Sequence, residues 1–124
     1  MPKLYILSGF SLNMLPIPCH VHMTITESFP DAARAIVESA RRRGREIISA
    51  VGHESTAKML TELLGVEVKA NRIMVKLEEG DTALIFQLFT RLPEGRVLNY
   101  GELADLMNRG LAKLLYLDVE TLVK

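Results

Sequence analysis

The sequence predicts a single-domain α/β (α+β) fold in which helices flank a mixed β-sheet. Its 124 residues, 48% of them apolar, are enough for one continuous core. Apolar runs of strand length alternate with stretches of helical spacing along the chain. One pair of neighbouring runs is joined by a turn signal typical of an antiparallel hairpin, so a purely parallel sheet is not expected. We therefore treat residues 1–124 as one domain.

Two different strand patterns open the chain. Residues 4–7 form an uninterrupted apolar run, which is typical of a strand buried on both faces. Residues 21–26 alternate apolar and polar side chains, and a period of two indicates a half-buried strand.

A helix, a strand and a second helix are expected next. Apolar residues recur at helical spacing over 33–40, after Pro30, and Gly44 marks the end of this helix. Residues 47–51 are a further strand candidate, and the pattern over 57–64 predicts the second helix. Gly65 should end it.

The clearest hairpin signal lies in the second half of the chain. Residues 73–77 alternate apolar and polar side chains, 79–81 carry turn-forming residues, and 83–89 are apolar. We therefore expect the first and last of these segments to pair as antiparallel strands.

A last helix and strand complete the predicted fold. Asn99 and Glu102 have the spacing of a capping box, which opens a helix with Leu103 and Leu106 on its inner face. Residues 114–119 form the final strand candidate.

The charge balance and cysteine content limit the function classes. Fifteen basic side chains match fifteen acidic ones, so no overall positive field favours duplex DNA or anionic membranes. Cys19 alone cannot form an intramolecular disulfide, which suits a reducing compartment. Polar residues interrupt the apolar stretch 4–19, and Pro16 and Pro18 precede the cysteine, which disfavours an export signal. We therefore expect a cytoplasmic protein without a membrane span.

The strongest local motif is Gly52-His53-Glu54-Ser55-Thr56, where a strand passes into a helix. The first N–H groups of a helix have no internal partners and attract anions such as phosphate. A protonated His53 beside a phosphodiester could donate a proton to a departing oxygen, as RNA cleavage by a ribose 2′-hydroxyl requires. The alternative is structural: Ser55 or Glu54 caps the helix, and His53 is a hydrogen-bonded turn residue.

Other polar side chains at strand ends are candidate ligand contacts. Ser11 and Asn13 follow the first strand, Arg72 stands beside Asn71, and Arg91 follows the run 83–89. Each also has an ordinary interpretation, in a turn for the first two and on the solvated surface for the arginines.

Two further clusters of polar residues give little indication of function. Cys19, His20 and His22 do not make a convincing metal site because no second cluster accompanies them, so we expect no metal. Arg41 to Arg45 are interpreted as a solvated helix end, although contact with RNA is an alternative.

Four segments of the chain resemble one family: the small ring nucleases of archaeal viruses and mobile elements that act as type III anti-CRISPR proteins. The resemblance covers most of the chain outside residues 16–45. The segments that carry it are Gly9-Phe10-Ser11-Leu12-Asn13-Met14-Leu15, Ala50-Val51-Gly52-His53-Glu54-Ser55-Thr56, Asn71-Arg72-Ile73-Met74-Val75-Lys76-Leu77 and Arg91-Leu92-Pro93-Glu94-Gly95-Arg96-Val97-Leu98.

This resemblance implies a homodimer that holds one cyclic tetra-adenylate across its two-fold axis and cuts it into di-adenylates without metal or cofactor. It implies that His53 is the general acid and that Arg91 and Glu94 surround the reacting phosphate. Glu54 and Pro93 depart from the family pattern, which has aspartate and glutamate there. The expected ligand-binding residues are Ser11, Asn13, Gly52, Ser55, Thr56, Asn71 and Arg72.

Two other functions remain open at this point. A non-cleaving sponge or sensor would bind the same cyclic oligonucleotide without cutting it. A dimeric DNA-binding viral regulator would place Arg41 to Arg45 or a surface helix on the DNA backbone, although zero net charge argues against binding to duplex DNA.

Overall fold

A computed structural model describes residues 2–91 and 98–124, and within them the chain forms one α+β unit around a five-stranded mixed sheet. The predicted fold class is confirmed. The elements in chain order are β1 (Leu4–Leu7), η1 (Leu12–Met14), β2 (His20–Ser28), α1 (Pro30–Arg42), β3 (Ile47–Ser49), α2 (Glu54–Leu64), β4 (Thr82–Leu88), α3 (Tyr100–Asn108) and β5 (Ala112–Val123).

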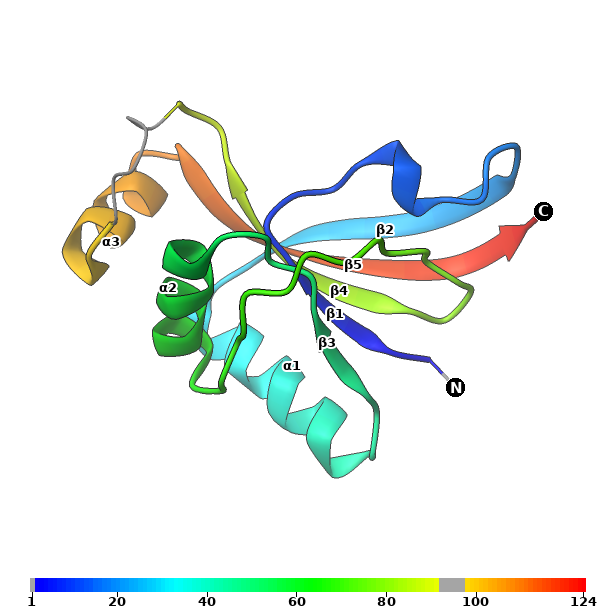
Figure 1. Cartoon of the computed structure of the whole chain (residues 1–124), viewed down its shortest axis with the longest axis horizontal. Helices are drawn as coiled ribbons and strands as arrows, with labels where there is room; N and C mark the ends of the chain where they lie inside the picture. The colour runs from blue at the N-terminus through cyan, green and yellow to red at the C-terminus, as the bar shows by residue number, and fades with distance from the viewer. Residues whose placement is uncertain (1, 92–97) are drawn as a thin grey trace.

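The strand order is β2-β5-β4-β1-β3 (Figure 1). β1 pairs in parallel with β3 and β4, whereas β5 is antiparallel to β2 and β4. Four strands therefore share one direction and only β5 runs the opposite way. As a result, the carboxyl ends of β1, β3 and β4 meet at a single edge of the sheet.

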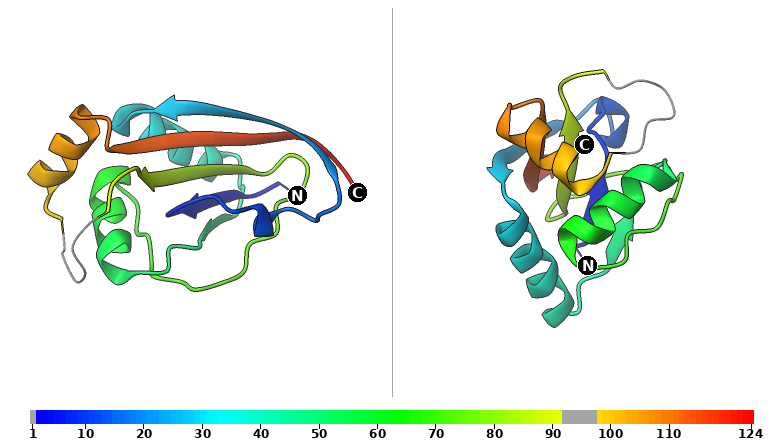
Figure 2. Two further views of the ribbon diagram at one scale, coloured as in Figure 1. Left: turned by 90° about the horizontal axis from the view of Figure 1, so that it is seen from above. Right: turned by 90° about the vertical axis from the view of Figure 1, so that its left-hand side faces the viewer.

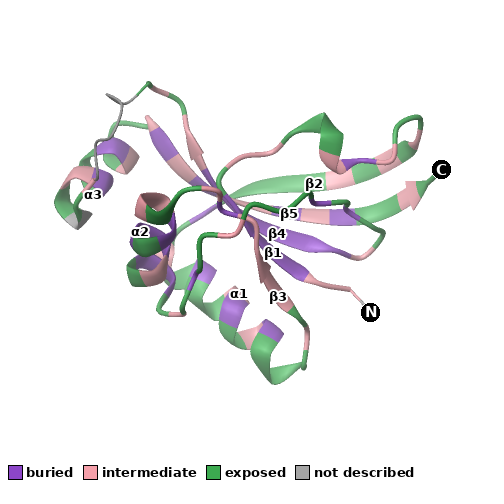
Figure 3. Cartoon of the chain, viewed as in Figure 1, coloured by how far each residue is buried: buried purple, intermediate pink, exposed green. Residues whose placement is uncertain are grey.

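The central strand β1 is buried on both faces, as its sequence predicts. Leu4 and Ile6 pack into a core cluster with the three α-helices, and Tyr5 and Leu7 pack into a second cluster on the opposite face. Burial is concentrated on the central strands and on the inner sides of the helices (Figure 3). The long pair of β2 and β5 runs side by side along the molecule (Figure 2).

Irregular chain and the short 3-10 helix η1, rather than α-helices, cover the second face. Leu15 comes from the loop after β1, and Val75 and Leu77 come from the segment that precedes β4; all three are buried there. The backbone N–H of Leu77 donates to the carbonyl of Met14 at 2.8 Å, which joins the two covering segments. The same two covering segments also form part of the candidate site.

The predicted hairpin of 73–77 with 83–89 is wrong. Residues 71–78 form no strand, because both edges of β4 are already occupied by β1 and β5. The alternation that suggested a strand instead buries Val75 and Leu77 against the second face. The turn was predicted correctly: the N–H of Asp81 donates to the carbonyl of Glu78 at 3.0 Å.

The remaining elements agree with the sequence pattern in kind, with different bounds. α3 begins with the predicted capping box, in which Asn99 accepts from the N–H of Glu102. β5 extends beyond 114–119 because it pairs with β2 on one side and β4 on the other. Within residues 2–91 and 98–124, none of the helices combines the length and apolar character that crossing a bilayer requires.

Candidate functional site

Three loops meet at the carboxyl edge of the parallel strands. β1 leads into Ser11 and Asn13, β3 leads into Gly52 and His53, and β4 leads into Arg91. Ligands commonly bind at this edge in open α/β sheets, because loops from adjacent strands present their polar groups together. The topology therefore gathers residues that are far apart in the sequence.

A hollow of about 500 Å³ lies at this edge, within the size range of small-ligand sites. Four residues predicted to bind ligand line it, one or two from each of three separate segments. The lining residues are Ser11, Asn13, Met14, Ala50, Gly52, Arg72, Ile73, Met74 and Val75.

Residues 69–72 hold one wall of the hollow against the end of β3. Val51 and Ala70 form an isolated parallel bridge, and the N–H of Asn71 donates to the carbonyl of Val51 at 2.8 Å. The side-chain amide of Asn71 donates to the carbonyl of Ser49 at 2.8 Å. Asn71, predicted as a ligand contact, therefore has a visible role in positioning the backbone beside the hollow.

Arg72 is placed directly beside the motif. Its Nε donates to the carbonyl of Gly52 at 3.0 Å, and the missing Cβ of Gly52 would lie 3.7 Å from its Cγ. Within residues 2–91 and 98–124, no carboxylate forms an ion pair with this exposed guanidinium. Its remaining N–H groups are thus available to an anion in the hollow.

The first loop is fixed from the other side. The hydroxyl of Ser11 accepts the N–H of Asn13 at 3.3 Å, which is the turn chemistry expected of such a residue. Lys76 donates through Nζ to the carbonyl of Asn13 at 2.8 Å. The side chains of Ser11 and Asn13 consequently line the hollow from an anchored loop.

His53 is the N-cap residue of α2, and its side chain is exposed and makes no capping hydrogen bond. The first intrahelical bond runs from the N–H of Ala57 to the carbonyl of His53 at 3.0 Å. In the described part of the chain, the N–H groups of Glu54, Ser55 and Thr56 have no protein acceptor. The alternative in which Ser55 or Glu54 caps this helix is therefore not what the structure has.

The structure brings only some of the predicted site residues together at the hollow. Ser55 and Thr56 lie in the first turn of α2, next to Gly52 but outside the lining of the hollow. Arg91 is exposed after β4 at the same edge of the sheet, and Glu94 lies outside the described residues. No hydrogen bond among described residues connects Arg91 with His53.

Comparison with known proteins shows to which family this chain is related. The sequence model of the STIV B116-like family matches residues 4–111. The chain belongs to the STIV B116-like family. Uncharacterized protein 26 of Sulfolobus islandicus filamentous virus is 42% identical over 99 residues, which cover 77% of this chain and 75% of that protein.

Two further relatives extend the match over nearly the whole chain. Uncharacterized protein ORF116 of Acidianus filamentous virus 1 is 32% identical, covering 96% of this chain and 97% of that protein. The solved structure of B116 of Sulfolobus turreted icosahedral virus is 32% identical, with a TM-score of 0.78 over 94% of this chain and 98% of that one. The STIV B116-like fold thus spans both core clusters and the hollow.

Sequence reasoning missed the apolar wall of the site in this member of the STIV B116-like family. Ile73 and Met74 line the hollow and are 45% and 81% exposed. Both lie in the segment that the sequence pattern assigned to a hairpin strand. Exposed apolar side chains gathered in a hollow are typical of a ligand-binding groove or an interaction surface.

The other histidines lie away from this edge, at the start of β2. His20 and His22 are exposed, as predicted, and Nδ1 of His22 lies 3.0 Å from a carboxylate oxygen of Glu120. A hydrogen bond from Thr24 is the main cause that lowers the pKa of Glu120, with His22 contributing. In the part of the chain that the structure describes, no three His, Cys, Asp or Glu residues are grouped for a metal ion.

Proposed function

We propose that this chain is a metal-independent ring nuclease that cleaves cyclic tetra-adenylate into di-adenylates. The observation that supports it best is the placement of an uncapped helix N-terminus, headed by His53, directly after Gly52 in the wall of the hollow. This pairs an anion-binding feature with a candidate proton donor. The four segments that resemble viral ring nucleases supply the substrate class.

In the proposed reaction a ribose 2′-hydroxyl attacks the adjacent phosphorus and loses its proton to solvent or a base. The bond from phosphorus to the 5′-oxygen breaks, and His53 gives its imidazolium proton to that oxygen. The products are a 2′,3′-cyclic phosphate and a free 5′-hydroxyl. Each cut therefore needs one proton delivered to the leaving oxygen, and no redox partner or metal enters the balance.

Negative charge on the phosphoryl oxygens would be stabilised by two groups. The N–H groups at the start of α2 follow Gly52 along the chain, and the guanidinium of Arg72 is hydrogen-bonded to its carbonyl. Hydrogen-bond donors fixed before the reaction lower the barrier because they do not reorganise as charge develops. Arg91 and Glu94 are proposed to complete the surroundings of the phosphate, as the family resemblance implies.

The proposed working unit is a homodimer. A ring of four identical nucleotides contains a two-fold axis, so an isologous dimer can present the same groups to opposite phosphodiesters. Each protomer then contributes one hollow and one His53. Within a hollow, Ile73 and Met74 would pack against an adenine while Ser11 and Asn13 contact polar edges of the nucleotide.

The proposed setting follows from the three relatives described above, which come from viruses. Removing cyclic tetra-adenylate in the cytoplasm of the host cell would silence type III CRISPR signalling and so protect the virus. This makes the chain an anti-CRISPR protein in the proposal.

The deciding experiment incubates the purified protein with labelled cyclic tri-, tetra- and hexa-adenylate, with and without EDTA. We expect cutting of the tetramer to di-adenylates at the same rate in both conditions. If every ring stays intact after long incubation with excess protein, the nuclease proposal fails. Loss of cutting in EDTA would overturn its metal-independent chemistry.

Binding measurements with cyclic tetra-adenylate and with random duplex DNA separate the two other functions. A sponge or sensor would bind cyclic tetra-adenylate tightly and leave it whole. A DNA-binding regulator would instead bind random duplex, with affinity that falls steeply as salt rises, and ignore the ring.

A further inference from the structure

A second pocket lies at the opposite end of the sheet from the hollow, between the last turns of α1 and the amino ends of β1 and β4. Its volume is about 230 Å³. This volume is smaller than that of most sites for drug-sized ligands, and it suits an inorganic anion or an anion that carries a short organic substituent. The lining residues are Leu4, Ala35, Ile36, Ser39, Ala40, Arg43, Arg45, Thr82 and Tyr116.

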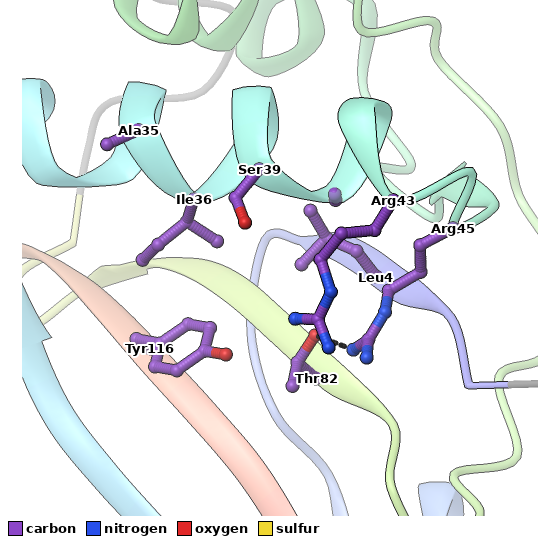
Figure 4. Close-up of a pocket in the computed structure, with 9 residues that line it drawn as sticks. Leu4, Ala35, Ile36, Ser39, Arg43, Arg45, Thr82 and Tyr116 are labelled. Carbon is purple, nitrogen blue, oxygen red and sulfur yellow. Dashed lines mark hydrogen bonds between the residues drawn. The ribbon is translucent and has the colours of Figure 1, made fainter.

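Two guanidinium groups converge on this pocket. Figure 4 shows the side chains of Arg43 and Arg45 extending side by side toward Thr82. Arg45 donates through one terminal nitrogen to the hydroxyl of Thr82 at 3.5 Å. Like charges normally separate in solvent, so their convergence over one pocket favours an anion between them.

Three hydroxyl groups also line the pocket, beside the apolar side chains of Leu4, Ala35, Ile36 and Ala40. The hydroxyls of Ser39 and Tyr116 point into the space between α1 and the sheet (Figure 4). Thr82 is buried, and Arg45, Ser39 and Tyr116 are partly buried. A hydroxyl can donate to an oxyanion, so guanidinium and hydroxyl donors surround one volume without an acidic side chain in the lining.

The backbone at the end of α1 places both arginines. The N–H of Gly44 donates to the carbonyl of Arg41 at 3.1 Å, and the N–H of Arg45 donates to that of Ala40 at 2.9 Å. These two bonds make a Schellman motif, which needs the left-handed backbone that Gly44 adopts, with φ of 68°. The motif turns Arg45 back over the sheet, beside Arg43.

The arginine side chains could instead cap the carbonyl end of α1, but the Schellman motif leaves them no such role. The carbonyls of Ser39, Ala40 and Arg41 already accept from backbone N–H groups of residues 43–45. No arginine side chain of this cluster bonds to a helix carbonyl among residues 2–91 and 98–124. Their charge is therefore not consumed by the helix end.

No carboxylate neutralises the pair either. Asp118 is opposite Thr82 in the pairing of β4 with β5, and Glu46 and Asp81 adjoin Arg45 and Thr82 in the chain. In the described structure no ion pair joins an acidic residue to Arg43 or Arg45. Two positive charges thus remain uncompensated at the mouth of a pocket in a chain of zero net charge.

We propose that this pocket is a binding site for a phosphate group, as the free ion or as a small phosphate monoester. Guanidinium groups match the geometry of phosphate oxygens better than that of a halide, and three hydroxyls supply further donors. The residues of this phosphate site differ from those of the proposed ring nuclease site, and the two sites lie at opposite ends of the sheet. An experiment can therefore disprove one proposal without affecting the other.

The test titrates inorganic phosphate, and separately glycerol phosphate, into the full chain at fixed ionic strength. We expect saturable binding of one anion per chain and movement of the backbone resonances of Ser39, Arg45 and Thr82 in NMR spectra. Tighter binding of one probe identifies the free ion or the monoester as the better occupant. Absence of saturation by both, or resonance shifts confined to residues 52–56 and 72, overturns the proposal.

Charge variants then separate a built site from a general basic patch. Arg43→Gln and Arg45→Gln should each weaken phosphate binding about tenfold or more, as expected for loss of a charge-assisted hydrogen bond. Arg42→Gln is the matched control, because it removes the same charge one residue away and Arg42 does not line the pocket. Equal weakening by Arg42→Gln and Arg43→Gln would overturn the site. Since the side chain of Arg43 makes no hydrogen bond among described residues, and the backbone bond from its N–H to the carbonyl of Ser39 does not depend on the side chain, its variant should remain folded.

Discussion

Arg72 and Gly52 are joined by a hydrogen bond of 3.0 Å from the guanidinium Nε to the backbone carbonyl. The bond spans 20 positions of sequence and fixes a cation beside the residue that precedes His53. Because Nε bonds to the backbone, the orientation of the guanidinium beside the hollow is restrained. This one contact links the wall of the hollow to the start of α2.

Replacing Arg72 by lysine should weaken binding of cyclic tetra-adenylate about tenfold. Lysine keeps the positive charge but cannot bond the carbonyl of Gly52 and present a planar fork to phosphate at the same time. A binding titration with a non-cleaving background variant measures the effect. Lys58→Gln, on the exposed side of α2 and outside the hollow, measures what the loss of a nearby surface charge does, and it should leave affinity within about twofold. Equal affinities of Arg72→Lys and the parent protein would remove Arg72 from the proposed site.

Replacing His53 by alanine should slow ring cleavage by about 10² to 10⁴, the usual contribution of a general acid. The affinity for cyclic tetra-adenylate should change little, because the exposed imidazole makes no hydrogen bond within the described chain. Single-turnover rates and a separate binding titration distinguish the two effects.

His53→Asn supplies the matching control, since asparagine is a favourable N-cap residue that cannot act as a proton donor of this kind. A rate as low as that of His53→Ala would assign the loss to chemistry rather than to the stability of α2. Full activity of either variant would contradict the role of His53.

The sequence was sufficient to name four of the nine residues that line the hollow, and three of these four follow strand ends. Ser11 follows β1 and Gly52 follows β3, and a parallel arrangement of these strands places both at one edge. Arg72 was found by its residue type and by the family resemblance. Its bond to Gly52 was not predictable, because it depends on how residues 69–72 return to the end of β3.

The error over residues 73–77 has a definite physical origin. Alternation of apolar and polar residues reports which side chains are buried, but it does not report what the backbone pairs with. Here Val75 and Leu77 are buried against the second face of the sheet, while β5 occupies the edge of β4 that the hairpin would need. Met74, on the outward side of the same segment, became an unpredicted part of the hollow.

This interpretation predicts a large cost for truncating the buried side of that segment. Leu77→Ala should lower the free energy of unfolding by about 2–5 kcal/mol, because Leu77 is 1% exposed and leaves a cavity in the second core cluster. Urea unfolding at neutral pH measures it.

Met74→Ala is the control within the same segment. Its side chain is 81% exposed, so the free energy of unfolding should change by less than about 0.5 kcal/mol. Similar costs for the two variants would contradict the packing of residues 71–78 on the second face.

Tyr5 should make the protein sensitive to alkaline pH. Burial raises the pKa of its hydroxyl above the ordinary value of 10.0, and the charges of Asp81, Glu78 and Glu46 raise it further. The folded state therefore holds the proton more tightly than the unfolded chain does. The stability that follows from this difference is complete below the unfolded pKa and is lost as pH rises from about 10 through the folded pKa.

Tyr5→Phe should consequently flatten the alkaline end of the stability profile. The measurement is the free energy of unfolding of the parent and the variant in steps from pH 8 to pH 11, with the difference between them shifting in favour of Tyr5→Phe above about pH 10. Tyr116→Phe controls for loss of an aromatic hydroxyl from a partly buried strand position. Parallel decline of the parent and Tyr5→Phe would show that deprotonation of Tyr5 is not what destabilises the fold, because only a group whose proton affinity changes on unfolding alters the slope.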